Sequence, residues 1–249
     1  MSVSTKAAIR LVRNRFLKAL PAFERRRIVA ELEMVDTPRA KSVTEIGQPM
    51  KFVYFPETCM VSVVSTTRSG TSIEVGIIGC RGMAALPVFL GFDDNLVESF
   101  VQVPGRAGRI PAETFRASAG PGTALYEQSL RYTSFFLQQI ARSAACNALH
   151  RLEQRCARWL LLTAEELGRQ DFSLTHEYLA EMLGVRRASI TDIAAEFSQR
   201  GLVRYSRARV RIIDVRGLSR AACECYRMVS DEAERMLSAP RKRGASSPR

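Results

Sequence analysis

Histidine and paired cysteines are scarce in this 249-residue chain, and their scarcity removes most catalytic and metal chemistry. Only His150 and His176 occur, and no Ser/His/Asp, HExxH or P-loop constellation is present. The six cysteines are too sparse for a secreted disulfide framework and include no CxxC pair. We therefore expect no enzyme, no catalytic residue, no metal site and no cofactor.

Cys223 and Cys225 are the cysteines closest together in the sequence. They lie in a segment whose pattern predicts a helix, where side chains two residues apart diverge by about 200° around the axis. We interpret them as structural residues rather than as metal or redox ligands. A reactive thiol at Cys80, Cys146 or Cys156 has no supporting signal.

Long apolar runs are also absent. No segment approaches the ~18–20 apolar residues of a membrane span, and the first ten residues lack the apolar core of a signal peptide. We therefore expect a cytoplasmic protein with no membrane partner. Positive charge, by contrast, is abundant, since 37 Lys and Arg against 25 Asp and Glu give a net charge of +12. This excess favours an anionic partner, although a merely soluble basic surface has the same composition.

Three patterns follow one another along the chain. A basic, helical segment extends to about residue 33, and short β-like runs separated by turn residues fill 35–111, as in a jelly-roll or similar double-sheet barrel. In one run, Ile73 and its apolar partners alternate with Glu74 and other polar or small residues, which is typical of a half-buried strand. Residues from about 122 to 155 then predict one long helix without Pro or Gly.

The long helix carries a candidate seam for a second helix. Apolar and small residues recur every seven positions, which suits helix–helix packing, although the repeat is imperfect. Packing of this helix against the β-rich segment is therefore the alternative. The candidate dimer-interface residues are Leu130, Thr133, Leu137, Ile140, Ala144 and Asn147.

Residues 174–213 have the spacing of a helix-turn-helix. Small and aliphatic residues occupy the positions that clamp two helices together, and Gly184 takes the tight turn between them. Gly201 ends the second helix. A short hairpin with four arginines follows, which is typical of a wing. After residue 239 the chain is basic and of low complexity, and we expect it to be disordered.

A β-barrel, a long helix and a winged helix-turn-helix together resemble the cyclic-AMP receptor / fumarate-nitrate regulator (CRP/FNR) family of bacterial transcription regulators. The most specific pieces are the block at 174–213, the VYFP run at 53–56 and the EVGIIGCRGM segment at 74–83. The resemblance covers nearly the whole chain. It implies a homodimer joined along the long helix, bound to a near-palindromic operator in double-stranded DNA, with RNA polymerase as a further candidate partner.

The resemblance also implies an α+β fold with four parts. These are an N-terminal cyclic-nucleotide-binding-like β jelly-roll at 1–121, a long dimerisation helix at 122–152, a C-terminal winged helix-turn-helix domain at 153–220, and a C-terminal helix with a basic tail at 221–249.

The sensor half departs from the family members that bind cyclic nucleotides. Those members carry a Gly-Glu pair, whose Glu accepts from the ribose hydroxyl, and a downstream Arg that pairs with the cyclic phosphate. Here the first pair is Gly82-Met83, and no Arg occurs at 95–99. Arg81 and Arg106 fit neither motif. We therefore expect an effector other than cyclic AMP, or constitutive binding. The oxygen-sensing branch does not fit either, because its N-terminal cysteine cluster is missing.

The recognition helix is predicted at about 187–199, with its N-terminal end in the major groove. Arg187 matches the family position that donates to guanine, and bidentate geometry suits that contact. Ala188 and Asp192 replace the family's next two readers, so we expect a different operator. Alternation would place Arg207, Arg209 and Arg211 on one face of the wing, where they bind phosphates. The candidate DNA-binding residues are Thr175, Arg186, Arg187, Ser189, Thr191, Asp192, Arg204, Arg207, Arg209 and Arg211.

A second class of function competes with DNA binding. The chain would then be a ligand-binding module whose C-terminal domain serves as a protein-interaction surface. The basic wing argues against this alternative, because a protein partner does not require four arginines so close together.

Overall fold

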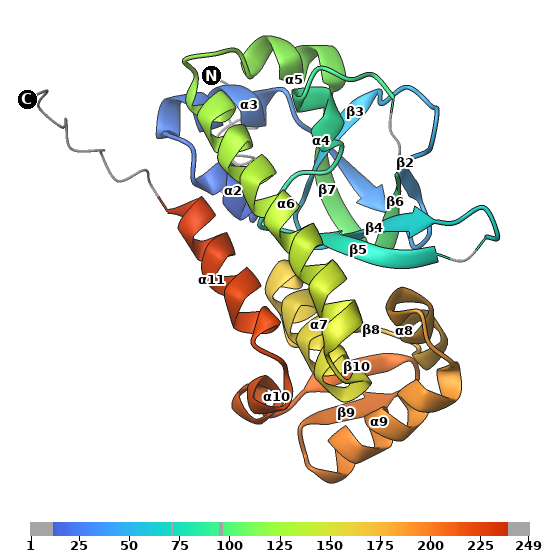
Figure 1. Ribbon diagram of the computed structural model, residues 1–249. Helices are drawn as coiled ribbons and strands as arrows, with labels where there is room; N and C mark the ends of the chain where they lie inside the picture. Colours follow the sequence, from blue (N-terminus) through green and yellow to red (C-terminus); the bar gives the residue numbers. More distant parts are fainter. Residues whose placement is uncertain (1–11, 71, 95–96, 239–249) are drawn as a thin grey trace, which may run out of the picture.

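The computed structural model describes residues 12–70, 72–94 and 97–238 (Figure 1). The expected disorder after residue 239 lies outside the described residues. The fold is α+β, with a β-rich N-terminal half, a long central helix and a helical C-terminal half that carries a small sheet. Figure 1 shows the long helix α6 running from the β-rich half to the C-terminal half, with the last helix beside it.

Two antiparallel sheets build the N-terminal half. Their strand orders are β1-β7-β3 and β2-β6-β4-β5. Aliphatic side chains from both sheets fill the interior, as in Val53 and Ile110 of the first sheet and Val101 of the second. The elements are α2 (Arg15–Lys18), α3 (Ala22–Ala30), β1 (Glu33–Thr37), β2 (Ser42–Thr44), β3 (Phe52–Pro56), β4 (Met60–Thr66), β5 (Ser72–Ile78), α4 (Leu86–Phe89), β6 (Glu98–Val103), β7 (Gly105–Pro111) and α5 (Ala112–Ser118).

Glu74 and Gly76 of β5 are buried, so the expectation that their face of the strand meets solvent was wrong, while Ile73 and Val75 on the other face stay partly exposed. The reason is tertiary, since helices of the C-terminal half cover the face that the alternation assigned to solvent. Glu74 on that face is only 8% exposed. Its carboxylate accepts hydrogen bonds from Trp159 Nε1 at 2.7 Å and from Ser62 Oγ at 2.5 Å.

The long helix α6 (Ala124–Leu149) begins at a Thr123 cap, whose hydroxyl accepts from the Tyr126 N–H at 3.1 Å. It ends earlier than the sequence indicated, because His150 and Arg151 are extended and α7 (Leu152–Leu167) starts afresh. The Gln154 side chain caps the new helix by accepting from the Arg151 N–H at 3.1 Å. No Gly or Pro marks this break. Among the described helices, none is long and apolar enough to cross a membrane.

The C-terminal half contains a helix-turn-helix with a wing. A β8-β10-β9 sheet flanks the two helices, and α11 returns along α6 (Figure 1). Gly184 takes a positive φ of 65° after the first helix, and Gly201 takes 68° after the second, as the spacing predicts. The elements are β8 (Asp171–Ser173), α8 (His176–Leu183), α9 (Arg187–Gln199), β9 (Val203–Ser206), β10 (Arg209–Ile212), α10 (Val215–Ala221) and α11 (Cys225–Leu237).

Candidate nucleic-acid interface

Helix α9 has one buried face and one exposed face. Ile190, Ala194 and Phe197 are at most 4% exposed and pack into the domain core. The opposite face is open, and it includes Arg187 and Asp192. The Arg187 side chain is 68% exposed, and its ion pair with Glu177 is long, with 3.7 Å between Nε and Oε2. The side chain predicted to read a base is therefore free to meet a partner.

The N-terminal ends of α8 and α9 border a hollow of about 520 Å³ together with the tip of the wing. Thr175 caps α8 by accepting from the Tyr178 N–H at 3.2 Å. Helix N-termini and cations on one surface attract phosphate oxygens. The hollow is lined by Leu174, Thr175, His176, Glu177, Arg187, Tyr205, Ser206, Arg207 and Ala208.

His176 links the two helices, a role that the sequence pattern did not reveal. Its Nδ1 lies 3.1 Å from Thr191 Oγ1, and its ring packs edge-on against Tyr205 with 4.9 Å between ring centroids. Burial lowers the pKa of His176, with a smaller contribution from the nearby Arg187 charge. Thr191 also donates to the Arg187 carbonyl at 3.2 Å, so its hydroxyl is already engaged within the domain.

The wing differs from the alternation that we expected. Arg207 and Ala208 both have positive φ, 45° and 60°, and form the two-residue turn between β9 and β10. Arg207 therefore lies at the tip and not on a strand face with Arg209 and Arg211. The strand register pairs Arg204 with Arg211, so the other three wing arginines share the outer face of the sheet.

Two of the three outer-face arginines, Arg209 and Arg211, already have an acidic partner. Arg211 Nη2 lies 2.8 Å from Asp171 Oδ2, and Arg209 pairs with the other carboxylate oxygen. These hydrogen bonds lower the pKa of Asp171. Of the remaining candidates, Arg186 is exposed at the start of α9 and Ser189 is partly buried in its first turn.

On the side away from the proposed DNA surface, buried ion pairs join α7 of the C-terminal half to the β-rich half. Arg81, 1% exposed, donates from Nε to Glu166 Oε1 at 2.7 Å and from Nη1 to Glu165 Oε2 at 2.8 Å. The Gly79 N–H donates to Glu166 Oε2 at 2.9 Å. A Cβ added at Gly79 would collide with the Glu166 carbonyl. The 79–83 segment therefore fits against α7 with no space between.

Protein atoms fill the region where the family's nucleotide motif falls. Met83 is fully buried, and a Cβ added at Gly82 would collide with the Tyr132 hydroxyl. Asn14 Nδ2 donates to the Gly82 carbonyl at 2.9 Å. At the second motif, Ser99 is buried and its hydroxyl lies 2.7 Å from that of Thr44, while Asn95 lies outside the described residues.

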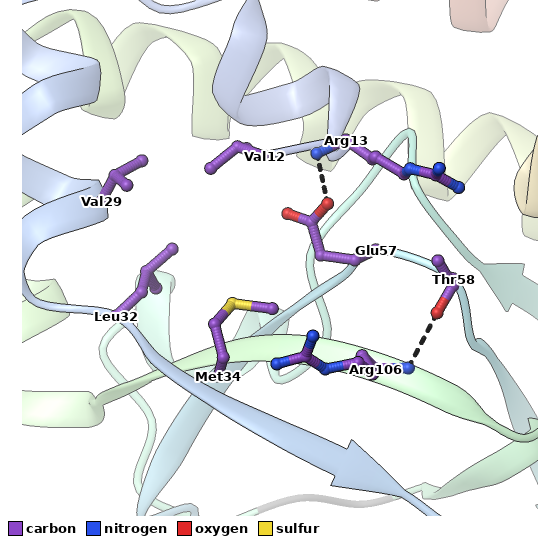
Figure 2. A pocket seen from close by; sticks show the side chains of 8 residues that line it. All are labelled: Val12, Arg13, Val29, Leu32, Met34, Glu57, Thr58 and Arg106. Carbon is purple, nitrogen blue, oxygen red and sulfur yellow. Dashed lines mark hydrogen bonds between the residues drawn. The ribbon is translucent and has the colours of Figure 1, made fainter. Parts of the chain in front are cut away.

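A cavity of about 440 Å³ opens elsewhere, between the segment before α2, helix α3, strands β1 and β7 and the loop after β3 (Figure 2). Glu57 points into it, and its Oε1 has no hydrogen-bond partner within the described part of the chain. Burial raises the pKa of Glu57. The lining residues are Val12, Arg13, Val29, Leu32, Met34, Glu57, Thr58 and Arg106.

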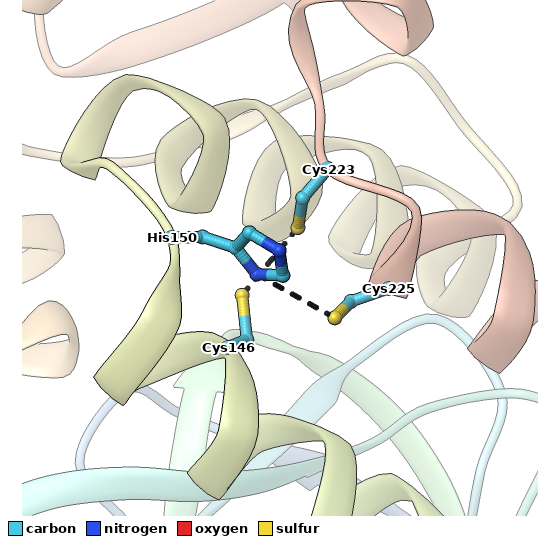
Figure 3. A group of neighbouring side chains, drawn as sticks. All are labelled: Cys146, His150, Cys223 and Cys225. Atoms are coloured by element: carbon cyan, nitrogen blue, oxygen red, sulfur yellow. Dashed lines mark hydrogen bonds between the residues drawn. The ribbon is translucent and has the colours of Figure 1, made fainter.

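A cluster of sulfur and imidazole side chains corrects the prediction for Cys223 and Cys225. Cys223 precedes α11, and the chain bends before Cys225, so the two side chains converge instead of diverging around a helix. They meet Cys146 and His150 from the end of α6 (Figure 3). The four potential ligand atoms all lie within 4.8 Å of one another. The arrangement is one that a metal ion could use, contrary to our expectation.

Comparisons with known proteins agree with this architecture. Residues 154–221 match the family model of the Crp-like helix-turn-helix domain. The CRP-like cAMP-activated global transcriptional regulator of Mycobacterium tuberculosis is 25% identical over 204 residues, which cover 78% of this chain and 90% of the relative.

Two solved structures share the fold. FixK2 from Bradyrhizobium japonicum has a TM-score of 0.66 at 11% identity, covering 77% of this chain and 98% of that one. TTHB099, a CRP family transcriptional regulator from Thermus thermophilus, has a TM-score of 0.61 at 19% identity, covering 76% of this chain and 96% of that one.

A β-sandwich joined by a long helix to an exposed winged helix-turn-helix defines a class of two-part DNA-binding regulators. The comparisons make the assignment more specific, because residues 154–221 carry a Crp-like helix-turn-helix domain and most of the chain is similar to a CRP-like transcriptional regulator. The DNA-binding domain of this chain is the Crp-like helix-turn-helix.

Proposed function

We propose that this protein is a homodimer that binds a near-palindromic DNA operator and responds to an effector other than cyclic AMP, or to none. The observation that carries the proposal is the surface where α8, α9 and the wing tip meet. Arg187, Arg207 and the capped end of α8 all border one open hollow there. A phosphate backbone along this hollow would bring the first turn of α9 to the base edges.

We assign recognition of the DNA bases to the first turns of α9. Arg187 has the exposure and the fork of donors needed for a guanine edge. Asp192 is exposed one turn further along and would accept from a cytosine amino group or repel other bases. Arg207 and Thr175 would contact phosphates and set affinity, with Arg186 beside them.

Dimerisation through α6 is supported by the stripe that this chain leaves open. Leu130 is 42% exposed and Leu137 is 63% exposed, and Ala144 follows them on the same line. Thr133, Ile140 and Asn147 flank the stripe and are partly exposed. The other face of α6 packs within the chain through residues such as Tyr132 and Phe136. One face of α6 therefore packs within its own chain, and the open stripe on another face is available for a second copy of the chain.

An effector other than cyclic AMP is supported by the closed motif region. Tyr132, Asn14 and Met83 fill the space where the Gly-Glu pair would hold a ribose. The Mycobacterium tuberculosis relative is described as cAMP-activated. Here we expect cyclic AMP to leave both the thermal unfolding midpoint and DNA affinity unchanged.

The test is selection of bound sequences from a random double-stranded DNA pool, followed by gel shifts on the enriched sequence. We expect two inverted half-sites with centres about one helical turn (~34 Å) apart. We also expect the complex to contain two chains by sedimentation, and Leu137→Arg to abolish the pair. Arg142→Ala, an exposed position on another side of α6, is the control. Enrichment of no palindrome would favour the protein-interaction alternative.

A further inference from the structure

The sulfur and imidazole cluster is not used by DNA recognition and lies at a structural junction. Cys146 belongs to the last turn of α6, and His150 follows that helix directly. Cys223 and Cys225 come from the bend between α10 and α11. The sequence separation between Cys146 and Cys223 is 77 residues. The chain between these two pairs forms α7, the helix-turn-helix with its wing, and α10, so the cluster brings together the two ends of that unit.

We propose that Cys146, His150, Cys223 and Cys225 bind one tetrahedral zinc ion. Zinc prefers this donor set, and Cys₃His is an established structural combination. Cys146 Sγ lies 3.5 Å from Cys223 Sγ, and Cys225 Sγ lies 3.7 Å from His150 Nδ1. A tetrahedral ion with ordinary zinc–sulfur and zinc–nitrogen bonds sets these edges at ~3.8 Å and ~3.6 Å. Both edges are thus near the lengths that zinc requires.

Other uses of the four side chains fit less well. A disulfide needs sulfurs about 2 Å apart, and the free Cys146 and Cys223 sulfurs are held well beyond that distance. Iron–sulfur clusters spread their ligands over several iron atoms and most often take four thiolates. Four ligand atoms within 4.8 Å of one another surround a single ion.

A carboxylate outside the cluster orients the imidazole. His150 Nε2 lies 3.2 Å from Glu224 Oε1, while Nδ1 faces the thiols. Ligating histidines usually donate their second ring N–H to a carboxylate, which fixes the tautomer and leaves the other nitrogen as the donor to the metal. Glu224 is therefore assigned as a positioning residue for His150.

The surroundings suit a closed structural site. The three cysteines are at most 4% exposed and form a small buried group apart from the main hydrophobic core. A zinc ion with three thiolates carries a net negative charge, and Arg158 interacts electrostatically with Cys146 and Cys225. Four protein ligands leave no open position for catalysis. The ion would hold α11 against the end of α6 and fix the break that leads into α7.

The experiment is metal analysis of the full chain purified under reducing conditions with zinc in the medium. We expect about one zinc per chain, and a cobalt(II)-substituted protein with the intense visible bands of a sulfur-rich tetrahedral site. Cys223→Ser and His150→Ala should lose most of the metal. Cys59→Ser and Cys156→Ser, two buried cysteines outside the cluster, should keep it. Glu224→Gln should bind about 10–100-fold more weakly.

Wild-type results decide the proposal even where a variant fails to fold. His150→Cys keeps a tetrahedral donor set and should retain zinc, which separates loss of a ligand from loss of the fold. Substoichiometric zinc with six free thiols would overturn the proposal. So would a Cys146–Cys223 disulfide in protein purified without reductant, or iron with acid-labile sulfide in place of zinc. These readouts are independent of DNA binding.

Discussion

The two sides of the DNA-binding unit use the same residue types in opposite ways. On the solvent side, Arg187 is 68% exposed and its nearest carboxylate oxygen is 3.7 Å away. On the side facing the β-rich half, Glu165 and Glu166 of α7 form two close ion pairs with Arg81 of that half, whose side chain is 2% exposed. An exposed arginine with a weak partner is available to an incoming phosphate or base. A buried arginine with two carboxylates is committed to holding the halves of the protein together.

The difference is energetic as well as geometric. Exposed ion pairs contribute about 0–1 kcal/mol and are screened by salt, so a partner can exchange them at little cost. A buried charge that loses its counter-charge is strongly destabilising. We therefore expect substitutions on the buried side to change folding, and substitutions on the exposed side to change binding alone.

The largest effect is expected for Arg81→Met, which leaves Glu166 buried without its partner. We expect a loss of about 3–5 kcal/mol in the free energy of unfolding, measured by urea titration. Arg106→Met is the matched control, since the Arg106 side chain is 60% exposed and its guanidinium lies 3.7 Å from the exposed Asp36 carboxylate. The double variant Arg81→Met/Glu166→Gln should be more stable than Arg81→Met alone. If the free energy of unfolding of Arg81→Met lay within about 1 kcal/mol of the wild-type value, the buried ion pairs would not hold the two halves together.

The second effect is a pH dependence that arises at Glu74. Burial raises the pKa of Glu74 to about 7, and the hydrogen bonds from Ser62 and Trp159 only partly oppose this. The native state therefore binds more protons than the unfolded state between the ordinary carboxyl pKa of 4.5 and about 7. Stability should fall as pH rises through this window, by about 3 kcal/mol in total, and level off above it.

Glu74→Gln tests this contribution, because the amide preserves the shape and can still accept from Trp159. We expect the free energy of unfolding of the variant, measured by urea titration at each pH, to increase relative to that of wild type as pH rises from 5 to 8. Glu98→Gln, at a partly exposed position of the same β-rich half, is the control and should follow the wild-type profile. Parallel profiles for wild type and Glu74→Gln would show that Glu74 does not titrate in this window.

The sequence predicted the exposed side far better than the buried one. The α8–α9 spacing, the turn at Gly184 and the Thr175 cap are local features, and local patterns determine them. Arg81 pairs with Glu166 and Glu74 with Trp159, each 85 positions away, so no periodicity reveals these contacts. The alternation around Glu74 predicted that its side chain faces solvent, whereas in the structure it faces Trp159.

The same limit explains the errors at the wing and at the cysteines. Arg207 was assigned to a strand, because Arg and Ala give no turn signal comparable to Asn-Gly. Cys223 and Cys225 were assigned to one helix, because neither Gly nor Pro marks the bend before α11. The Cys-x-x-x-His spacing at the end of α6 was the available signal, and it gains meaning only when the second pair is brought next to it.

The third prediction concerns the exposed side. Arg187→Ala should weaken binding to the selected operator by about 1–3 kcal/mol and relax the preference at one base pair per half-site. Its stability should stay close to that of wild type, in contrast to Arg81→Met. Arg200→Ala is the control, because Arg200 lies at the far end of α9 and pairs with Glu153 and Glu196. Equal weakening on all DNA sequences would exclude base reading by Arg187.

The smallest effect separates the wing tip from its outer face. Arg207→Asn removes the charge with a residue that tolerates the positive φ of 45°. We expect the slope of log affinity against log salt concentration to decrease in magnitude by about 0.9 per half-site, the value of one phosphate contact. Arg209→Gln should change it by less than half as much, because Asp171 already neutralises that guanidinium. Equal changes at the two positions would mean that DNA displaces Asp171, and the outer face would then join the interface.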